Sequence, residues 1–300
     1  MGRYVYYHET GIFIVTTNGD TPNESGWNYQ AFYENGSMRI WNDIDHLNAF
    51  LAYERPSVST LAADFIGGTS STQHPRVLIN SSEFNRLKTL YNSGSDEFYT
   101  KIVRAKLAIA NAYLQQATVP YGYQDDMRSL TNAGKLLDRF MHWGFAYNMT
   151  GDTAYVDRAY KELLSMEEYP DFNTSHIIDA GTYVMATAIA YDWFYNGFNE
   201  EQRALAKKIC LERGLPSLAE GMYGRAVSSS NGSNRFVAFR QKNNYNSIIA
   251  GGCLCAAVAT MENDPDYCLD VVANCLRSLE YSLAELMPGG SWAEGPSYWN

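Results

Sequence analysis

Three short stretches of this 300-residue sequence concentrate side chains that can bind an anion or move a proton. They are TSHIID (174–179), QKNNYN (241–246) and EGPSYW (294–299). In the second stretch, an Asn amide offers two hydrogen-bond donors to a carboxylate, and the apolar run that follows predicts a helix whose N-terminus adds a positive potential. Asn243 and Asn244 therefore suit an anion, although a role as a helix N-cap explains at least one of them without any ligand.

The other two stretches carry groups that titrate. His176 opens another apolar helix, where a histidine is more often a cap or a hydrogen-bonded core residue than a ligand. Tyr298 lies in a turn-rich segment between Glu294 and Trp299, and without a ligand these side chains are plain surface and packing residues. A tyrosine has a pKa near 10, so only about one in a thousand is phenolate at pH 7. Nearby cations lower that pKa and prepare the side chain to act as a base.

Cations do precede the stretch at 241–246. Arg235, Arg240 and Lys242 end a segment, 213–242, whose centre is rich in Ser, Asn and Gly. This composition predicts a long loop, and a long loop inside a compact domain is usually functional or disordered. We expect the segment to form a wall or lid of a cleft, while a solvated basic loop explains the same charges.

Pairs of helical segments repeat along the chain from residue 74. In each pair an apolar segment comes first and an amphipathic segment follows, and the apolar members begin near residues 131, 177 and 244. A helix that is apolar all round is buried, whereas a one-sided helix faces water. The repeat therefore predicts a mainly α protein, an incomplete (α/α) toroid with inner helices covered by outer ones. The rival, a flat helical solenoid, would keep a stricter repeat spacing.

The expected helix boundaries carry appropriate residues. Asn199 with Gln202 has the spacing of a capping box, and Asp264 before Pro265 gives an N-cap followed by proline at the first helical position. These signals place the outer segments of the second and third pairs.

The N-terminal segment, 1–73, differs from the rest of the chain. RYVYYHETGIFIVTTNG and NYQAFYENGSMRIW are rich in aromatic and β-branched residues and predict strands, with turns at Asn18-Gly19 and Asn35-Gly36. We expect a small β-rich domain or extension over 1–73, linked by FIGGTSSTQ to a helical domain over 74–300.

Composition narrows the functional classes. The formal net charge of −10 argues against a general nucleic-acid binder, while an anionic sugar stays possible because local charge matters more than the total. The 23 Tyr, 13 Phe and 6 Trp suit a sugar-binding cleft and an ordinary core equally. Five cysteines without zinc-like spacing predict buried thiols. No stretch predicts a membrane span or a signal peptide, which leaves a cytoplasmic protein or one whose signal has been removed.

Several stretches together resemble the heparinase II/III family of polysaccharide lyases. They are HPRVL, NMTGD, SHIIDAGTYVMATAIAYDWFY, NEEQR, NNYN and GGSWAEGPSYW, in that order over roughly residues 74–300. The resemblance implies an α/α toroid followed by a β-sandwich, with the active site in the cleft between them. It also implies a secreted or periplasmic enzyme. On this basis we expect the sequence to end at the junction of the two domains, and this piece to be nearly inactive alone.

The resemblance also implies a reaction, β-elimination at a uronic acid of an anionic polysaccharide or oligosaccharide. In the family an Asn or His at the toroid mouth neutralises the C6 carboxylate, and a Tyr later in the chain takes the C5 proton, protonates the O4 leaving group, or does both. Asn244 matches the first residue, with Asn243 as an alternative register, and Tyr298 matches the second. Several relatives have His where this chain has Tyr245.

The remaining predicted contacts form the substrate-binding set: Asn243, Tyr245, His176, Arg240, Lys242, Glu294 and Trp299. No cofactor, nucleic acid or membrane is expected, and the particular polysaccharide and the oligomeric state stay open. Two other functions remain. One is an α/α-barrel glycoside hydrolase, which needs two carboxylates about 5–10 Å apart, for which Asp179, Asp192 and Glu294 are available. The other is a non-catalytic glycan-binding protein.

Overall fold

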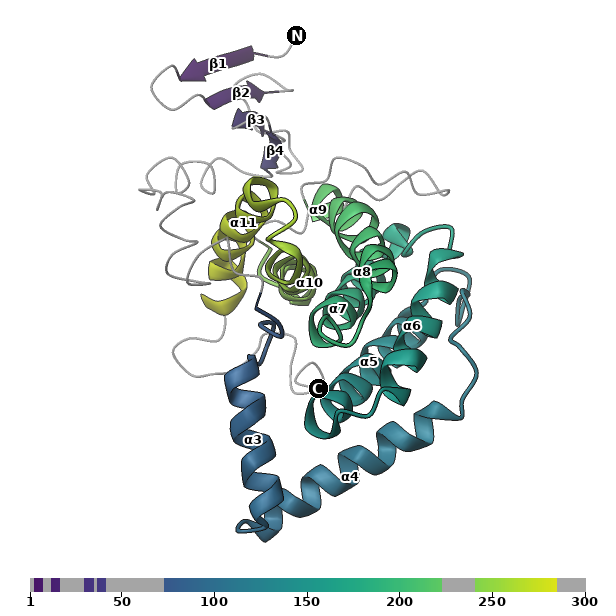
Figure 1. The fold of residues 1–300 in the computed structure, drawn as a ribbon. Coiled ribbons are helices and arrows are strands. Elements are labelled where there is room, and N and C mark those ends of the chain that lie inside the picture. Colours follow the sequence, from purple (N-terminus) through teal and green to yellow (C-terminus); the bar gives the residue numbers. More distant parts are fainter. Residues whose placement is uncertain are drawn as a thin grey trace.

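The computed structural model describes residues 73–222 and 241–284, together with four strands within residues 3–41. The described part of the chain is mainly helical, which confirms the predicted mainly α class. Figure 1 shows most of the helices packed side by side.

The four strands pair in the order β1-β2-β3-β4, and all neighbours are antiparallel. The strands are β1 (Arg3–Tyr7), β2 (Ile12–Thr16), β3 (Gln30–Glu34) and β4 (Ser37–Trp41). Pairing of Glu34 with Ser37 leaves Asn35 and Gly36 between the strands, which is where the sequence predicts a two-residue turn. The other predicted turn, at 18–19, lies outside the described residues.

The helical part follows residues 73–80, an irregular segment with bends at 74 and at 77–79. Its elements are α3 (Ser81–Ser93), α4 (Glu97–Leu114), α5 (Leu130–Thr150), α6 (Ala154–Glu167), the 3₁₀ turn η1 (Thr174–His176), α7 (Ile177–Trp193), α8 (Glu200–Lys207), the π-helical η2 (Lys208–Gly214), α9 (Leu215–Met222), α10 (Asn244–Thr260) and α11 (Pro265–Ala284).

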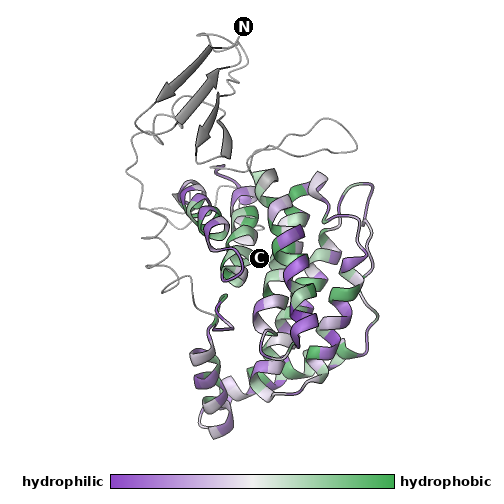
Figure 2. Cartoon of the chain, turned by 45° about the horizontal axis from the view of Figure 1, so that its top comes forward, coloured by the Kyte–Doolittle hydropathy of each residue, from purple (hydrophilic) through white to green (hydrophobic). Residues whose placement is uncertain are grey.

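Three helical hairpins form two layers. In the inner layer α7 packs against α5 on one side and against α10 on the other. In the outer layer α6, the α8–α9 segment and α11 each follow an inner helix and pack against it (Figure 1). Figure 2 shows hydrophobic residues along these helices, with hydrophilic residues interspersed on those facing the viewer. The three pairs thus follow the predicted order of an inner helix and then a covering helix, although α11 buries residues 271–275 in succession and is not one-sided.

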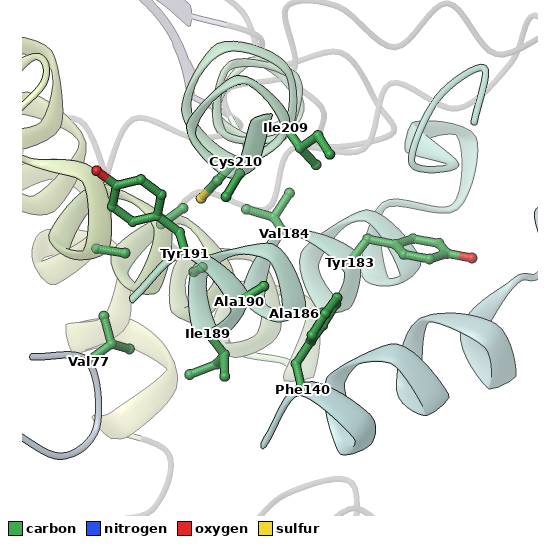
Figure 3. Packing of buried hydrophobic residues seen from close by; sticks show 14 of the residues in the cluster. Val77, Phe140, Tyr183, Val184, Ala186, Ile189, Ala190, Tyr191, Ile209 and Cys210 are labelled. Atoms are coloured by element: carbon green, nitrogen blue, oxygen red, sulfur yellow. The ribbon is translucent and has the colours of Figure 1, made fainter. Parts of the chain in front are cut away.

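The inner helices differ in how completely they are buried. Every residue of α7 except Thr182 and Met185 is buried, and most of α10 is too. Helix α5, which the sequence predicts to be a buried inner helix, buries chiefly one face, because it lies at the end of the inner layer. Figure 3 shows the side chains of α7 at the centre of the resulting core.

Two glycines bring α7 and α10 together. A Cβ on Gly252 would lie 2.6 Å from the carbonyl oxygen of Gly181, a distance that real side chains do not show. A Cβ on Gly181 would lie 3.0 Å from Ile248 Cγ2 and 3.2 Å from the Ile248 carbonyl oxygen. Since Gly181 and Ile248 are each the fifth residue of their helix, the two helices run parallel and begin at the same level.

The predicted caps of the outer helices are present. Asn199 and Gln202 form a reciprocal capping box at the start of α8, and Asp264 Oδ1 accepts the Tyr267 N–H as α11 begins at Pro265. These caps begin the outer helices directly after the turns in which the chain reverses direction behind α7 and α10.

The predicted loop at 213–242 is wrong over its first ten residues. The outer helix continues through η2 and α9 as far as Met222, and Leu215, Leu218 and Met222 bury their side chains. Pro216 lacks an N–H and favours a break, but the wider π-helical turn before it, in which the Leu215 N–H bonds to the Cys210 carbonyl, carries the helix past the proline. Residues 223–240 lie outside the described part.

The cysteines are free thiols, as predicted. Four are buried and Cys255 is half-buried. Burial raises the pKa of Cys210 to about 12 and that of Cys255 to about 11, so both are protonated and unreactive near neutral pH. Among the described helices, none combines the length and the apolar character needed to cross a membrane.

Candidate functional site

The inner helices bring their N-termini to one end of the helical body. Ser129, which precedes α5, donates its backbone N–H to Asp179 Oδ2 in the first turn of α7 at 2.5 Å. The level starts of α7 and α10 place residues 241–246 at this end as well. We call this end the mouth and define it by Ser129, residues 173–179 and residues 241–246.

His176 and Asp179 form a hydrogen-bonded pair at the mouth. His176 Nδ1 lies 2.8 Å from Asp179 Oδ1, because residues three apart at the start of a helix share one face. Asp179 is fully buried, whereas the His176 side chain is 14% exposed. When Nδ1–H donates to the carboxylate, Nε2 carries the free lone pair, and Nε2 has no hydrogen-bond partner among the described residues.

Buried groups hold the Asp179 carboxylate in place. Asn173 Nδ2 donates to Oδ2 at 2.8 Å, in addition to the Ser129 N–H. The Ser129 hydroxyl in turn bonds to Tyr183 OH at 2.7 Å and to the Gly122 carbonyl at 2.6 Å. A histidine oriented by a fixed carboxylate is an arrangement that can act as a general base or bind an anion once protonated. This role of Asp179 was not predicted, and its one signal in the sequence is its position three residues after His176.

The start of α10 differs from that of α7. Asn243 occupies the N-cap position in extended conformation, but its side chain makes no capping hydrogen bond, and the first turn of α10 contains no acidic residue. Asn243 Oδ1 is buried and has no hydrogen-bond partner among the described residues. Asn244 and Tyr245 are half-buried, and Lys242 is exposed. No acidic side chain in the described first turn therefore offsets the positive end of α10.

One polar residue of this stretch is structural. Asn246 Nδ2 donates to the carbonyls of Gln241 and Ser278, each at 2.7 Å, and its Oδ1 accepts the Ser278 hydroxyl at 2.6 Å. These bonds satisfy Asn246 and fasten the start of α10 to α11. The role was not predicted, because nothing in the QKNNYN stretch shows which Asn faces the outer helix.

The structure thus gathers part of the predicted site. His176, just before α7, lies at the mouth with Lys242, Asn243, Asn244 and Tyr245, which come from the start of α10 much later in the chain. The other predicted residues lie outside the described residues: Arg240, Glu294, Tyr298 and Trp299.

A second histidine–carboxylate pair lies at the opposite end of α7. His74 Nδ1 is 2.6 Å from Asp192 Oδ1, and both side chains are fully buried. His74 Nε2 lies 3.0 Å from Arg76 Nη2 and 3.4 Å from Glu262 Oε1, and the Arg76 guanidinium bonds to Glu262 Oε2. Burial lowers the pKa of His74, but hydrogen bonds to Asp192 and Glu262 outweigh it and raise the pKa above its ordinary value. Both ring nitrogens of this imidazole have a protein partner.

Each end of α7 carries a tyrosine that bonds to its polar groups. Tyr183 OH bonds to Ser129 at the mouth, and Tyr191 OH donates to Glu262 Oε1 at 2.6 Å at the other end. Figure 3 shows the two hydroxyl groups pointing out of the hydrophobic cluster on opposite sides.

The carboxylates Asp179 and Asp192 cannot serve a glycoside hydrolase together. They are thirteen residues apart on one helix, which is about 20 Å at about 1.5 Å per residue. A hydrolase pair needs about 5–10 Å. Asp192 is also occupied, since its oxygens accept the backbone N–H groups of Arg76 and Val77 as well as bonding to His74.

A cavity of about 780 Å³ lies away from the mouth. Residues 73–83 line it together with Leu254, Cys255 and Val258 in the second half of α10. Its buried charged group, Arg76, is bound to Glu262, so the cavity offers less chemistry than the mouth. Within the described residues, no group of three or more His, Cys, Asp or Glu side chains is arranged to hold a metal ion.

Comparison with models of protein families found no match to this chain, and comparison with curated proteins found none either. Function is therefore inferred from the chemistry of the mouth.

Proposed function

We propose that the protein is a polysaccharide lyase that cleaves a uronic-acid-containing polysaccharide by β-elimination. The observation that carries the proposal is that the His176–Asp179 pair lies at the same end of the inner helices as the start of α10, where the Asn243 side chain makes no capping hydrogen bond. The first can exchange a proton and the second attracts an anion, and β-elimination at a uronate needs both.

The architecture supports the same proposal at a coarser level. Three hairpins, each with an inner and an outer helix, are the repeating unit of an incomplete (α/α) toroid. The toroid and a following β-sandwich that completes the cleft belong to the proposal, as does membership of the heparinase II/III-like lyases.

The C6 carboxylate of the substrate binds at the start of α10. The C5–H of a uronate is a weak acid while the C6 carboxylate is negative, since removal of the proton adds a second charge. Donors aimed at the carboxylate stabilise that charge as it develops, in the manner of an oxyanion hole. We assign this role to Asn244, with Asn243 as the alternative, and the positive end of α10 assists them.

Proton transfer is assigned to Tyr298, as the base, the acid or both. One base takes the C5 proton, the electron pair forms the C4–C5 double bond, and the bond from C4 to the leaving oxygen breaks while an acid protonates that oxygen. Tyr298 is assigned to this step by the resemblance of GGSWAEGPSYW, which follows NNYN in the same order as in the lyase family. His176, whose Nδ1 is held by Asp179 and whose side chain is partly exposed, is assigned to substrate binding.

The test is to incubate the full-length protein with a panel of uronate polysaccharides and record absorbance of the unsaturated product in the near ultraviolet. We expect product from the wild type and none from Tyr298→Phe, which keeps the ring and removes the titrating hydroxyl. Full activity in Tyr298→Phe would refute the assignment of Tyr298. Cleavage without a double bond would indicate a hydrolase, and binding without cleavage a glycan-binding protein, and either result would overturn the proposal.

A further inference from the structure

The loop before α5 borders the mouth. Its Gly122 carbonyl accepts the Ser129 hydroxyl at 2.6 Å, and its Met127 carbonyl accepts Asn173 Nδ2 at 2.7 Å. Ser129 and Asn173 are the same residues that hold the Asp179 carboxylate. The loop is therefore fixed to the support of the His176–Asp179 pair, and whatever it exposes lies next to the mouth.

Tyr123 is exposed in this loop but not free to move. The residue is 48% exposed, and its hydroxyl lies 2.6 Å from the hydroxyl of Tyr121. Tyr121 donates its own proton to Asp171 Oδ1 at 2.8 Å, so Tyr123 is the donor in the bond between the tyrosines. The two rings pack edge to face at 5.6 Å, and Tyr121 packs in turn against Tyr169 at 5.4 Å.

The hydrogen bond from Tyr123 to Tyr121 has a consequence for ligand binding. The hydroxyl of Tyr123 is held by Tyr121 while nearly half of the residue stays exposed, so its ring is held in place at the surface. A ring held in place loses little conformational entropy when a ligand stacks on it. The apolar C–H face of a pyranose is a suitable partner for such a ring, because aromatic side chains combine a flat apolar surface with specific geometry.

The charges beside Tyr123 select against a uronate. Asp171 is exposed, and its Oδ1 is already used by Tyr121 and by the Asn173 N–H at 2.7 Å. Asp126, three residues after Tyr123, is also exposed. A uronate carboxylate placed here would be repelled, whereas a hydroxyl of an uncharged sugar can donate to the Asp171 carboxylate.

We propose that Tyr123, Tyr121 and Asp171 form a stacking subsite for an uncharged sugar unit that neighbours the uronate bound at the mouth. The inference rests on the proposed function and adds to it. The substrate is then a polysaccharide in which uronate alternates with an uncharged sugar, in preference to a homopolymer of uronate.

Calorimetric titration with two defined hexasaccharides tests the subsite. One alternates glucuronate with N-acetylglucosamine, and the other contains only mannuronate. We expect the wild type to bind the alternating chain more tightly. Tyr123→Ala should weaken that binding about three- to tenfold, the range of an aromatic stacking contact, and leave binding of the mannuronate chain unchanged. Met127→Ala is the matched control, since Met127 lies in the same loop and is 46% exposed.

Two further variants separate the parts of the subsite. Tyr123→Phe keeps the ring without its tether and should lose less affinity than Tyr123→Ala. Asp171→Asn keeps an acceptor for Tyr121 and should strengthen binding of the mannuronate chain. If Tyr123→Ala binds both chains as Met127→Ala does, the subsite is refuted while the proposed function stands. If the wild type binds neither chain, the proposed function fails and the subsite with it.

Discussion

The two ends of α7 carry the same chemical pair in opposite settings. At one end Asp192 binds His74, and at the other Asp179 binds His176. Both carboxylates are fully buried and each bonds to the Nδ1 of its histidine. The histidines differ, since the His74 side chain is fully buried and that of His176 is 14% exposed. A histidine–carboxylate pair alone therefore does not indicate function. The difference lies in whether the histidine Nε2 already has a partner in the protein.

The closed setting around His74 has a structural purpose. Its ring stacks on Tyr195 at 3.9 Å, and its carbonyl accepts Asn196 Nδ2 at 2.8 Å and the Ser81 hydroxyl at 2.6 Å. Together with the bonds to Asp192, these contacts fasten residues 73–80 to the end of α7. Around His176, by comparison, the contacts among the described residues fix the imidazole through Nδ1 only and leave Nε2 for a ligand.

The largest effect expected is on stability, from removal of the carboxylate at the closed end. Asp192→Ala leaves His74 and the N–H groups of Arg76 and Val77 without their acceptor. Breaking a buried, hydrogen-bonded charge pair costs about 3–5 kcal/mol, so urea unfolding should show a loss of that size. Asp126→Ala, at an exposed site, should change the unfolding free energy by less than about 0.5 kcal/mol. A loss below about 1 kcal/mol in Asp192→Ala would show that the pair does not hold the fold.

Substitution of His176, at the other end of α7, should change activity more than stability. We expect His176→Ala to lower the rate of unsaturated product formation about 100-fold, the lower range for loss of a proton-transfer or charge-binding group. Its unfolding free energy should fall by about 1–3 kcal/mol, less than in Asp192→Ala, because Asp179 Oδ1 loses its partner while the Ser129 N–H and Asn173 still bond to Oδ2. A variant that unfolds as readily as Asp192→Ala while keeping its rate would reverse the roles of the two ends.

The contribution of the His74 end to stability should depend on pH. The raised pKa of His74 means that its stabilising effect is complete below the ordinary value of 6.5 and is lost as pH rises through the folded-state pKa. Burial raises the pKa of Glu262, but His74, Tyr191 and Arg76 outweigh it and lower the pKa to about 2. The Glu262 contribution is therefore complete above about 4.5 and is lost toward pH 2.

The two contributions overlap between about pH 4.5 and 6.5. We expect the stability difference between the wild type and His74→Gln to be largest in that window and to shrink at pH 8.5. Chemical unfolding at pH 5.5 and 8.5 checks this, and an equal difference at both pH values would contradict it.

The smallest effect on stability should come from Asn243. A lost N-cap typically costs about 1 kcal/mol, but Asn243 makes no capping bond, so Asn243→Ala should cost less than about 0.5 kcal/mol. Asn199→Ala, which breaks the capping box of α8, is the matched control and should cost the usual amount. If the two variants are equally destabilised, Asn243 is an ordinary cap and its assignment to an anion site loses its basis.

The repeating elements were more predictable from the sequence than the site. Apolar and amphipathic segments identify the inner and outer helices. A helix buried on all sides is apolar throughout, and a helix buried on one side is apolar on that side only, so neighbouring residues reveal the difference. Local pattern was misleading at Gly214 and Pro216, where contacts of the following apolar residues keep the outer helix intact. The side-chain pattern around 241–246 identified a polar helix start but not which residue faces α11.

The two histidine pairs show why the site was only partly predictable. His176 and Asp179 are close in sequence, whereas His74 and Asp192 are far apart along the chain and meet only in the folded protein. Likewise the supports of Asp179 come from Ser129 and Asn173, which precede two different helices. Long-range contacts of this kind leave no local signal, so the closed pair and the tethered Tyr123 emerge only from the structure.

The central claim is that the mouth, with His176, binds uronate while the His74 end does not. Imidazole ¹⁵N resonances, assigned with His74→Gln and His176→Gln variants, test it during titration with a uronate oligosaccharide. The account predicts that the His176 Nε2 resonance shifts in a saturable way and that the His74 resonances stay unchanged. Saturable shifts at His74 with none at His176 would contradict it.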